Sequence, residues 1–196
     1  IQLPILIFMG LPFPLALATH KVATVALGVG ATLRHLKAKT LQPWLLWLIL
    51  LSGAPGVAIG ALFILGVDAR HAEIALGLLT LALALYSRLS PGLGLTAQPR
   101  HRNTADIILG GIVLLLIGFA NGALSAGSGL FVTLWLVYWF GLDYKTAVAQ
   151  TLVAVGLGWN CTGAVTMGIG ADVQWSWVPA LIAGSLLGGY LGANTS

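Results

Sequence analysis

The sequence contains few charged residues: only 7% of its 196 residues are Asp, Glu, Lys or Arg. Soluble domains carry about 25% charged residues, so a soluble enzyme of this size would lack the charge to cover its surface. There is a single cysteine, Cys161, which excludes a scaffold of intramolecular disulfides. A disordered chain is excluded too, because 58% of the residues are hydrophobic and the mean hydropathy is +0.97. These features indicate a polytopic membrane protein built of helices.

The small amount of charge is unbalanced, with nine basic and five acidic residues and a net charge of +4. No basic stripe with interleaved aromatic residues is present, so we expect no nucleic-acid partner. We interpret the basic excess as a signal that sets the orientation of the chain in a membrane. We therefore expect membrane lipid to surround the protein. A nucleotide-binding motif is also lacking, and we therefore expect no ATP coupling within this chain, no cofactor and no metal site.

Apolar segments separated by Gly, Pro and charged residues predict the helices. Five of them are long enough to span a membrane, which takes about 20 residues; they cover 15–36, 43–66, 71–89, 143–167 and 175–193. Two shorter segments, 105–120 and 130–140, flank a cluster of small residues. They form either two tight spans or a re-entrant hairpin, and the sequence is compatible with both. A membrane β-barrel is excluded, because its strands show alternating polarity over only about 10 residues.

The two halves of the chain align at an offset of 131 residues, which indicates an internal repeat. Among the matched positions are Gly10 with Gly141, Trp44 with Trp175, and Gly53 with Gly184. The tryptophans and the glycine spacing carry most of the weight, because matches between Ala, Gly and Leu are common by chance in such a chain. We expect a first repeat at 1–90, a linker at 91–104 and a second repeat at 105–196. Since each repeat lacks a helix that the other has, a complete chain would hold roughly 249 residues.

The positions of the basic residues predict how the repeats are oriented. Six of the nine basic residues fall on one side of the predicted helices: Arg34, Lys37, Lys39, Arg88, Arg100 and Arg102. By the positive-inside rule, loops 34–41 and 88–104 are cytoplasmic. Loop 166–174 is the second-repeat equivalent of loop 34–41, but it has no Lys or Arg and is placed on the outer side. The predicted fold is thus an all-α polytopic membrane protein with an inverted-topology repeat and Gly-rich broken or re-entrant segments, an architecture of many secondary transporters.

The small-residue cluster is the first candidate binding site. Its members are Asn121, Ser125, Gly127, Ser128 and Gly129. Glycines in the middle of a membrane segment open the helix, and the exposed N–H groups of a half-helix attract anions. Such backbone is tolerated at that depth only around a protein-lined or wet cavity. The alternative is a tight turn between two spans, or close packing of small residues.

The second candidate is the polar stretch Thr19, His20 and Lys21 in the first long helix. Charge inside a membrane is costly and is by default a sign of function. Lysine attracts anions, and histidine can carry a proton near neutral pH. The alternative is that Lys21 extends its side chain to the outer interface.

The equivalent stretch of the second repeat is polar but uncharged, and it contains Gln150 and Thr151. Facing one cavity, the two stretches would form a pseudo-symmetric site, with Asn160 further along the same path. Cys161 is interpreted as a small packing residue rather than a reactive one.

Three motifs of the second repeat are similar to those of a known family. They are the glycine cluster 125–129, the stretch 141–151 with its Ala-rich helix, and the turn Gly170–Trp175. With 16–21 and 34–37 of the first repeat, the chain resembles the TauE/SafE permeases, the sulfite exporter and toluene-sulfonate uptake family. The resemblance implies transport of sulfur-containing anions, such as sulfite or organosulfonates, commonly across the bacterial inner membrane. The chain departs from the family pattern at Ser125 and Ser128, and it lacks the cluster of the first repeat, so the substrate is left open.

From the residues and the resemblance together we expect a secondary transporter rather than an enzyme. A small anion would bind near the midplane and cross by alternating access, coupled to protons or another ion. An anion channel or a structural membrane subunit is the alternative. The stretch Ala126–Gly129 also has some similarity to the nucleophile turn of serine hydrolases, with Ser128 as nucleophile. An intramembrane hydrolase is disfavoured, because the first glycine of that motif is replaced by Ala126.

Overall fold

The computed structural model describes residues 2–38, 41–89, 100, 103–125 and 127–195. The regular structure in these ranges is helical, and no strand occurs among them. In chain order the α-helices are α1 Gln2–Phe8, α2 Phe13–Ala38, α3 Pro43–Leu65, α4 Ala69–Leu89, α5 Thr104–Leu124, α6 Ser128–Tyr138, α7 Tyr144–Val153, α8 Asn160–Gly170 and α9 Val178–Thr195. A π-helical segment, η1 (Ala154–Trp159), joins α7 to α8. The predicted linker 91–104 falls mostly outside the described residues.

The starts of several helices follow from local chemistry. Pro43 occupies the first turn of α3, where its missing N–H costs no hydrogen bond. The Asn103 side chain accepts a hydrogen bond from the Asp106 N–H at 2.8 Å and caps α5. Asp143 caps α7 in the same way, accepting from the Thr146 N–H at 2.9 Å. Its partial burial alone would raise the pKa of Asp143, but hydrogen bonds from Thr146 and nearby backbone N–H groups outweigh this and leave that pKa below its ordinary value.

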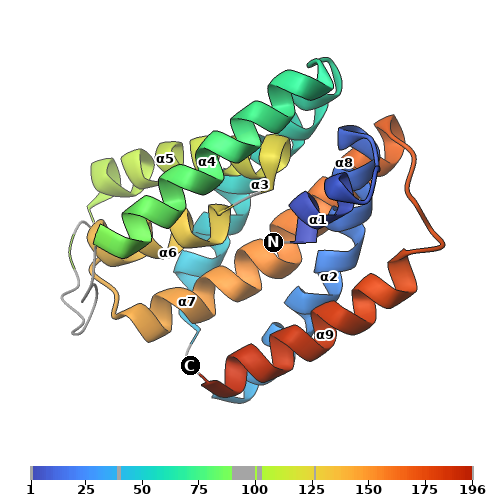
Figure 1. Cartoon of the computed structure of the whole chain (residues 1–196). Coiled ribbons are helices and arrows are strands. Elements are labelled where there is room, and N and C mark those ends of the chain that lie inside the picture. The colour runs from blue at the N-terminus through green and yellow to red at the C-terminus, as the bar shows by residue number, and fades with distance from the viewer. Residues whose placement is uncertain (1, 39–40, 90–99, 101–102, 126, 196) are drawn as a thin grey trace.

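The segment α7–η1–α8 runs through the middle of the molecule and separates two groups of helices (Figure 1). On one side α2 packs against α7, η1 and α8, and helices α9 and α1 pack against α2. On the other side α3 packs against η1 and α8, and helix α5 packs against α3. Consecutive helices α2 and α3 are therefore held together mainly through this central segment.

Among the described helices the most extensive contact is between α3 and α5, and glycines make this approach possible. A side chain at Gly56 would collide with the Leu115 carbonyl, and one at Gly122 would collide with the Val57 carbonyl. Small residues thus allow α3 and α5 to pack closely, as is common between membrane helices. In α9, by contrast, a Cβ atom at Gly184 would meet no other atom within 4 Å.

Four of the described segments are long and apolar enough to cross a membrane: Phe13–Gly30, Pro43–Leu65, Thr104–Leu124 and Tyr144–Gly170. Three of these correspond to predicted spans. The fourth, α5, is longer than the predicted segment 105–120, because the helix continues through Asn121 and Gly122 to Leu124. The predicted segment 71–89 forms α4, several of whose later side chains lie outside the described set. The predicted segment 175–193 forms α9, which begins at Val178 rather than at Trp175.

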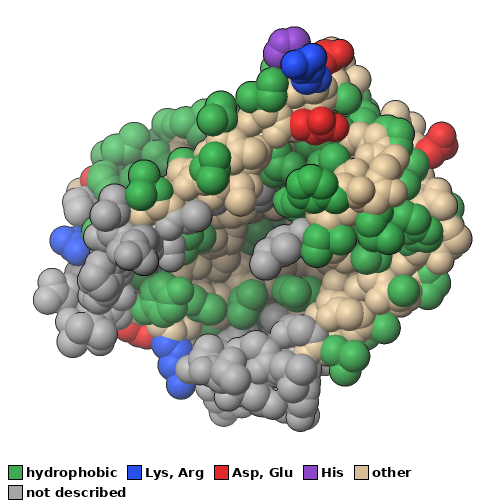
Figure 2. Space-filling model, viewed as in Figure 1, with side chains coloured by type: hydrophobic (Ala, Val, Ile, Leu, Met, Phe, Trp, Pro, Cys, Tyr) green, Lys and Arg blue, Asp and Glu red, His purple; other side chains and the backbone are tan. Residues whose placement is uncertain are grey.

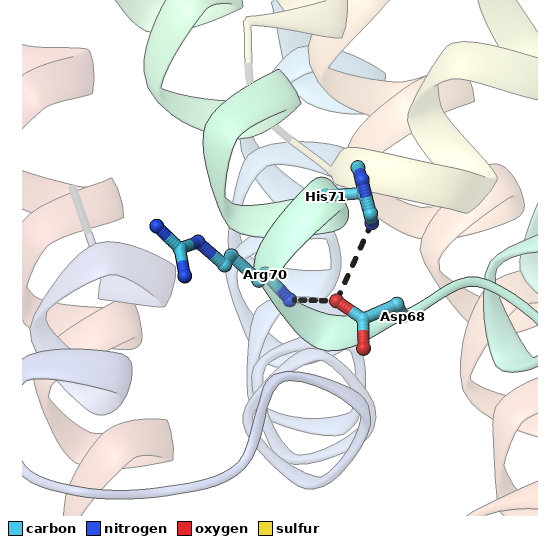
Figure 3. Close-up of polar contacts among 3 residues, drawn as sticks. All are labelled: Asp68, Arg70 and His71. Carbon is cyan, nitrogen blue, oxygen red and sulfur yellow. Dashed lines mark hydrogen bonds and ion pairs between the residues drawn. The ribbon is translucent and has the colours of Figure 1, made fainter.

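Hydrophobic side chains lie over much of the visible surface, and most of the charged side chains in view lie near its edge (Figure 2). Leu51, Leu81 and Leu187 are each more than 60% exposed, as expected for side chains that face lipid. One group of polar residues lies at the turn from α3 to α4, where Asp68 accepts a hydrogen bond from the Arg70 N–H and approaches the His71 ring at 3.4 Å (Figure 3). This pair is exposed and contributes little to stability.

Candidate functional site

Three predicted site residues from three different helices form one buried hydrogen-bond network. Lys21 of α2 donates through Nζ to the backbone oxygen of Asn121 at 2.8 Å and to its Oδ1 atom at 2.6 Å. Asn121 of α5 donates in turn through Nδ2 to Oγ of Ser128, the first residue of α6, at 2.6 Å. Lys21 is 0% exposed, Asn121 2% and Ser128 4%. The alternative in which Lys21 reaches out to the membrane interface is therefore wrong, because its ammonium group points into the protein.

The network surrounds the break between α5 and α6. Ser125 ends α5 in the left-handed conformation with φ of 55°, and Gly127 follows with φ of 67° just before α6. The residue at the N-terminal cap of α6 is Gly127, which has no side chain to cap the helix. Since the first N–H groups of a helix have no partner within it, this end presents donors and the positive end of the helix dipole. The break is shorter than the predicted cluster 121–129, because Asn121 still belongs to the last turn of α5.

The positive charge of Lys21 has no counter-ion among the described side chains. Among the described side chains no carboxylate lies within ion-pair distance of Lys21, and the pair His71–Asp68 lies at the exposed turn described above. A lysine ammonium has three donors, and Asn121 oxygens accept from Lys21 at two positions. A buried cation that meets only neutral acceptors is costly, and the binding of an anion would relieve that cost.

His20 does not join this network, although it precedes Lys21 in the chain. Its Nδ1 atom lies 2.9 Å from Oε1 of Gln2 in α1. It lines a cleft of about 980 Å³ between α1, α2 and α9, together with Thr24 and Ser185. The expectation that His20 and Lys21 act in a single site is therefore wrong in this structure, because their side chains leave α2 on different faces.

Two other predicted site residues are bound to nearby backbone. Thr19 donates to the Leu15 carbonyl at 2.7 Å and accepts from the Gln174 N–H at 3.0 Å, which ties α2 to the loop before α9. Asn160 donates to the Gly156 carbonyl at 3.2 Å, within the π-helical segment. These contacts explain both side chains structurally, and neither is hydrogen-bonded to the Lys21 network.

The remaining predicted pair, Gln150 and Thr151, lies on α7 beside α6. Thr151 receives a hydrogen bond from Thr133 at 3.0 Å, and its methyl group adjoins Gly129. Gln150 donates to the Gln42 carbonyl at 3.1 Å, while its buried Oε1 atom has no hydrogen-bond partner in the part of the chain that the structure describes. Gly129 follows Ser128, so this second polar group adjoins the start of α6.

Sequence reasoning missed two residues that the fold brings to these groups. Thr133 lies one turn into α6 and pairs with Thr151. Gly163 of α8 lies against the Lys21 side chain. Nothing in a single sequence marks either of them, since a threonine and a glycine are both ordinary in membrane helices.

The chain was compared with known proteins. The family described as Sulfite exporter TauE/SafE matches residues 1–196. A probable membrane transporter protein of Haemophilus influenzae is 28% identical over 194 residues, covering 99% of this chain and 75% of the relative. Probable membrane transporter protein YunE of Bacillus subtilis is 25% identical over 192 residues, covering 91% and 70%. Probable membrane transporter protein ORF9 of Sinorhizobium sp is 30% identical over 156 residues, covering 77% and 57%. No solved structure matches the chain significantly.

Proposed function

The chain belongs to the sulfite exporter TauE/SafE family of membrane transporters, and from this premise we propose that it is a secondary transporter for small sulfur-containing anions. The observation that carries the proposal is the fully buried Lys21, hydrogen-bonded only to neutral groups among the described residues. An anion that reached Lys21 would supply the negative charge that the described residues do not provide there.

The donors around Lys21 suit an anion with several oxygens. The ammonium group bonds to Asn121 just before the α5–α6 break, and the Ser128 hydroxyl and the first N–H groups of α6 lie just after it. Sulfite and sulfonates carry three oxygens on one sulfur atom, so donors from different directions can be used at the same time. A helix N-terminus adds attraction for negative charge without a second buried cation. This chemistry and the name of the family both support the proposed substrate class.

Alternating access requires that the site be reached from each side in turn. Complete burial of Lys21 supports this mechanism, because an anion reaches it only if helices move. Two repeats, at 1–90 and 105–196, would supply the moving parts. Helices α2 and α7 begin at Phe13 and Tyr144, which differ by the same offset of 131 residues, and Gly10 and Gly141 before them both have positive φ. These correspondences support the repeat.

Inversion of the repeats has a direct test. We propose that loops 34–41 and 88–104 face the cytoplasm of a bacterial inner membrane and that loop 166–174 faces outward. In a Cys161→Ser background, Lys37→Cys and Ile169→Cys should react with a membrane-impermeant maleimide from opposite sides. Labelling of both from the same side would contradict the inversion.

We propose that coupling involves protons and that His20 carries them, because its ring lines the cleft on the other face of α2. In this scheme the anion and the proton use separate faces of one helix. Movement of α2 would then link the two sites.

Flux into proteoliposomes tests the proposed function. The panel is sulfite, sulfate, thiosulfate, sulfoacetate and taurine, with acetate as the carboxylate control and protein-free vesicles as the blank. We expect saturable uptake of sulfite or a sulfonate and little uptake of acetate. Equal uptake of all anions, or of none, would contradict the sulfur-anion proposal. Flux that rises linearly with concentration would indicate a channel instead.

A further inference from the structure

The Lys21 side chain lies directly against Gly163 of α8. A Cβ atom built on Gly163 would be 2.9 Å from Cδ of Lys21, 3.0 Å from Cε and 3.3 Å from Nζ. Real Cβ atoms essentially never come closer than 3.0 Å to such neighbours and seldom closer than 3.4 Å. Any side chain at position 163 would therefore displace the end of Lys21.

The path of Lys21 explains why this position is critical. Helix α8 packs against α2 on one side and against α3, the partner of α5, on the other (Figure 1). Lys21 starts on α2 and ends on Asn121 of α5. Its side chain thus joins the two groups of helices, and it passes α8 at Gly163.

Gly163 differs from the glycines that serve helix packing. At Gly56 and Gly122 the nearest atoms to an added Cβ belong to the backbone of another helix, so those positions set the distance between helices. At Gly163 all three nearest atoms belong to the lysine side chain. A side chain there would move a flexible group and leave the helices in place.

From this geometry we propose that Gly163 is a positioning residue, which holds the Lys21 ammonium on Asn121 by leaving room for the lysine to pass. The expected effect of Gly163 on transport rests on the function proposed above. The expected effect on stability does not, because the Lys21–Asn121 contact is part of the folded protein whatever the substrate.

Two single variants and their combination test the proposal. Gly163→Ala should displace the ammonium and raise the apparent KM for the transported anion about tenfold, the loss expected for one hydrogen bond to a charged group, with a smaller change in Vmax. It should also lower the Tm of the detergent-purified protein. In a Lys21→Ala background the space is vacant, so the same Gly163→Ala change should leave the Tm unchanged or raise it.

Gly168→Ala is the matched control, since Gly168 lies on the same helix and a Cβ there would meet no atom within 4 Å. It should preserve KM and should not lower the Tm in either background. A Gly163→Ala variant with the parent KM, or with the same Tm change in both backgrounds, would overturn the proposal. If the parent protein transports no anion, the function proposed above fails, and the Tm comparison still decides the role of Gly163.

Discussion

Two consecutive residues of α2, His20 and Lys21, lie in different surroundings. Lys21 is wholly buried and hydrogen-bonded to Asn121, at the break between α5 and α6. His20 faces Gln2 and the cleft between α1, α2 and α9. Because neighbouring residues of an α-helix point about 100° apart, one polar stretch serves two faces.

In the proposed scheme, the two faces carry two functions that the sequence places together. The Lys21 face holds the buried Lys21–Asn121–Ser128 network, at which we propose that the anion binds, and it is closed to solvent. The His20 face has a large cleft whose lining is mostly apolar, with few polar groups such as Thr24 and Ser185. We therefore expect changes on the two faces to affect different properties of transport.

The largest effect should come from removing the charge on the Lys21 face. Lys21→Gln keeps a polar side chain without the charge and should lower uptake at subsaturating substrate about a hundredfold, because a buried charge interaction is lost. Initial rates in proteoliposomes measure this loss. Lys145→Gln serves as the control, since Lys145 is an exposed lysine at the start of α7. Unimpaired uptake by Lys21→Gln would remove the anion site from this face.

A smaller loss should follow from cutting the second link of the same network. Ser128→Ala removes the hydroxyl that accepts from Asn121, and we expect uptake to fall about threefold to tenfold. Ser185→Ala, on the cleft side, should change uptake by less than about twofold, because that hydroxyl is outside the network. Equal losses of uptake in the two serine variants would indicate that the faces do not differ in anion binding.

His20→Gln should leave anion binding nearly intact and change coupling. We expect a KM within about threefold of the parent value, because His20 makes no hydrogen bond to the Lys21 network. Uptake should no longer respond to an imposed proton gradient, which a pyranine-loaded vesicle assay can follow. A gradient response like that of the parent protein would exclude His20 as the proton carrier.

The smallest effect should appear at Asp143, which caps α7 and belongs to neither face. Asp143→Ala should cost about 1 kcal/mol of stability, whereas Asp143→Asn should cost less, because asparagine also caps helices. The pKa of Asp143 is lowered in the fold, so its contribution is complete above the ordinary pKa of an aspartate and is lost as the pH falls through the lowered value. Unfolding in SDS at several pH values measures this loss. A change of KM in Asp143→Ala would show that the cap also affects the site.

Much of the helical architecture could be predicted from composition and breaker residues. The predicted segments 43–66 and 15–36 correspond closely to α3 and α2, because long apolar stretches between Pro and charged residues permit little else in a membrane. Boundaries near glycine were less accurate. Helix α5 continues past Asn121, because an asparagine can remain in a helix when its side chain has buried hydrogen-bond partners.

The candidate site was predictable in part. Lys21, Asn121 and Ser128 could be selected because polar groups in a membrane need a partner or a function. The contact of Lys21 with Asn121 could not be predicted, since 100 residues separate them and the choice depends on which helices pack together. The π-helical segment before Asn160 could not be predicted either, because no simple sequence pattern indicates its hydrogen bonding.

By itself, the sequence determined that this protein is a helical membrane protein and which few polar residues it holds within its helices. The physical reason is local: apolar length, scarcity of charge and helix breakers act within a segment. Only the tertiary structure decided that Lys21 reaches Asn121 past Gly163 while His20 faces the other way. Those contacts depend on how helices distant in the sequence pack together, and packing is a property of the whole fold.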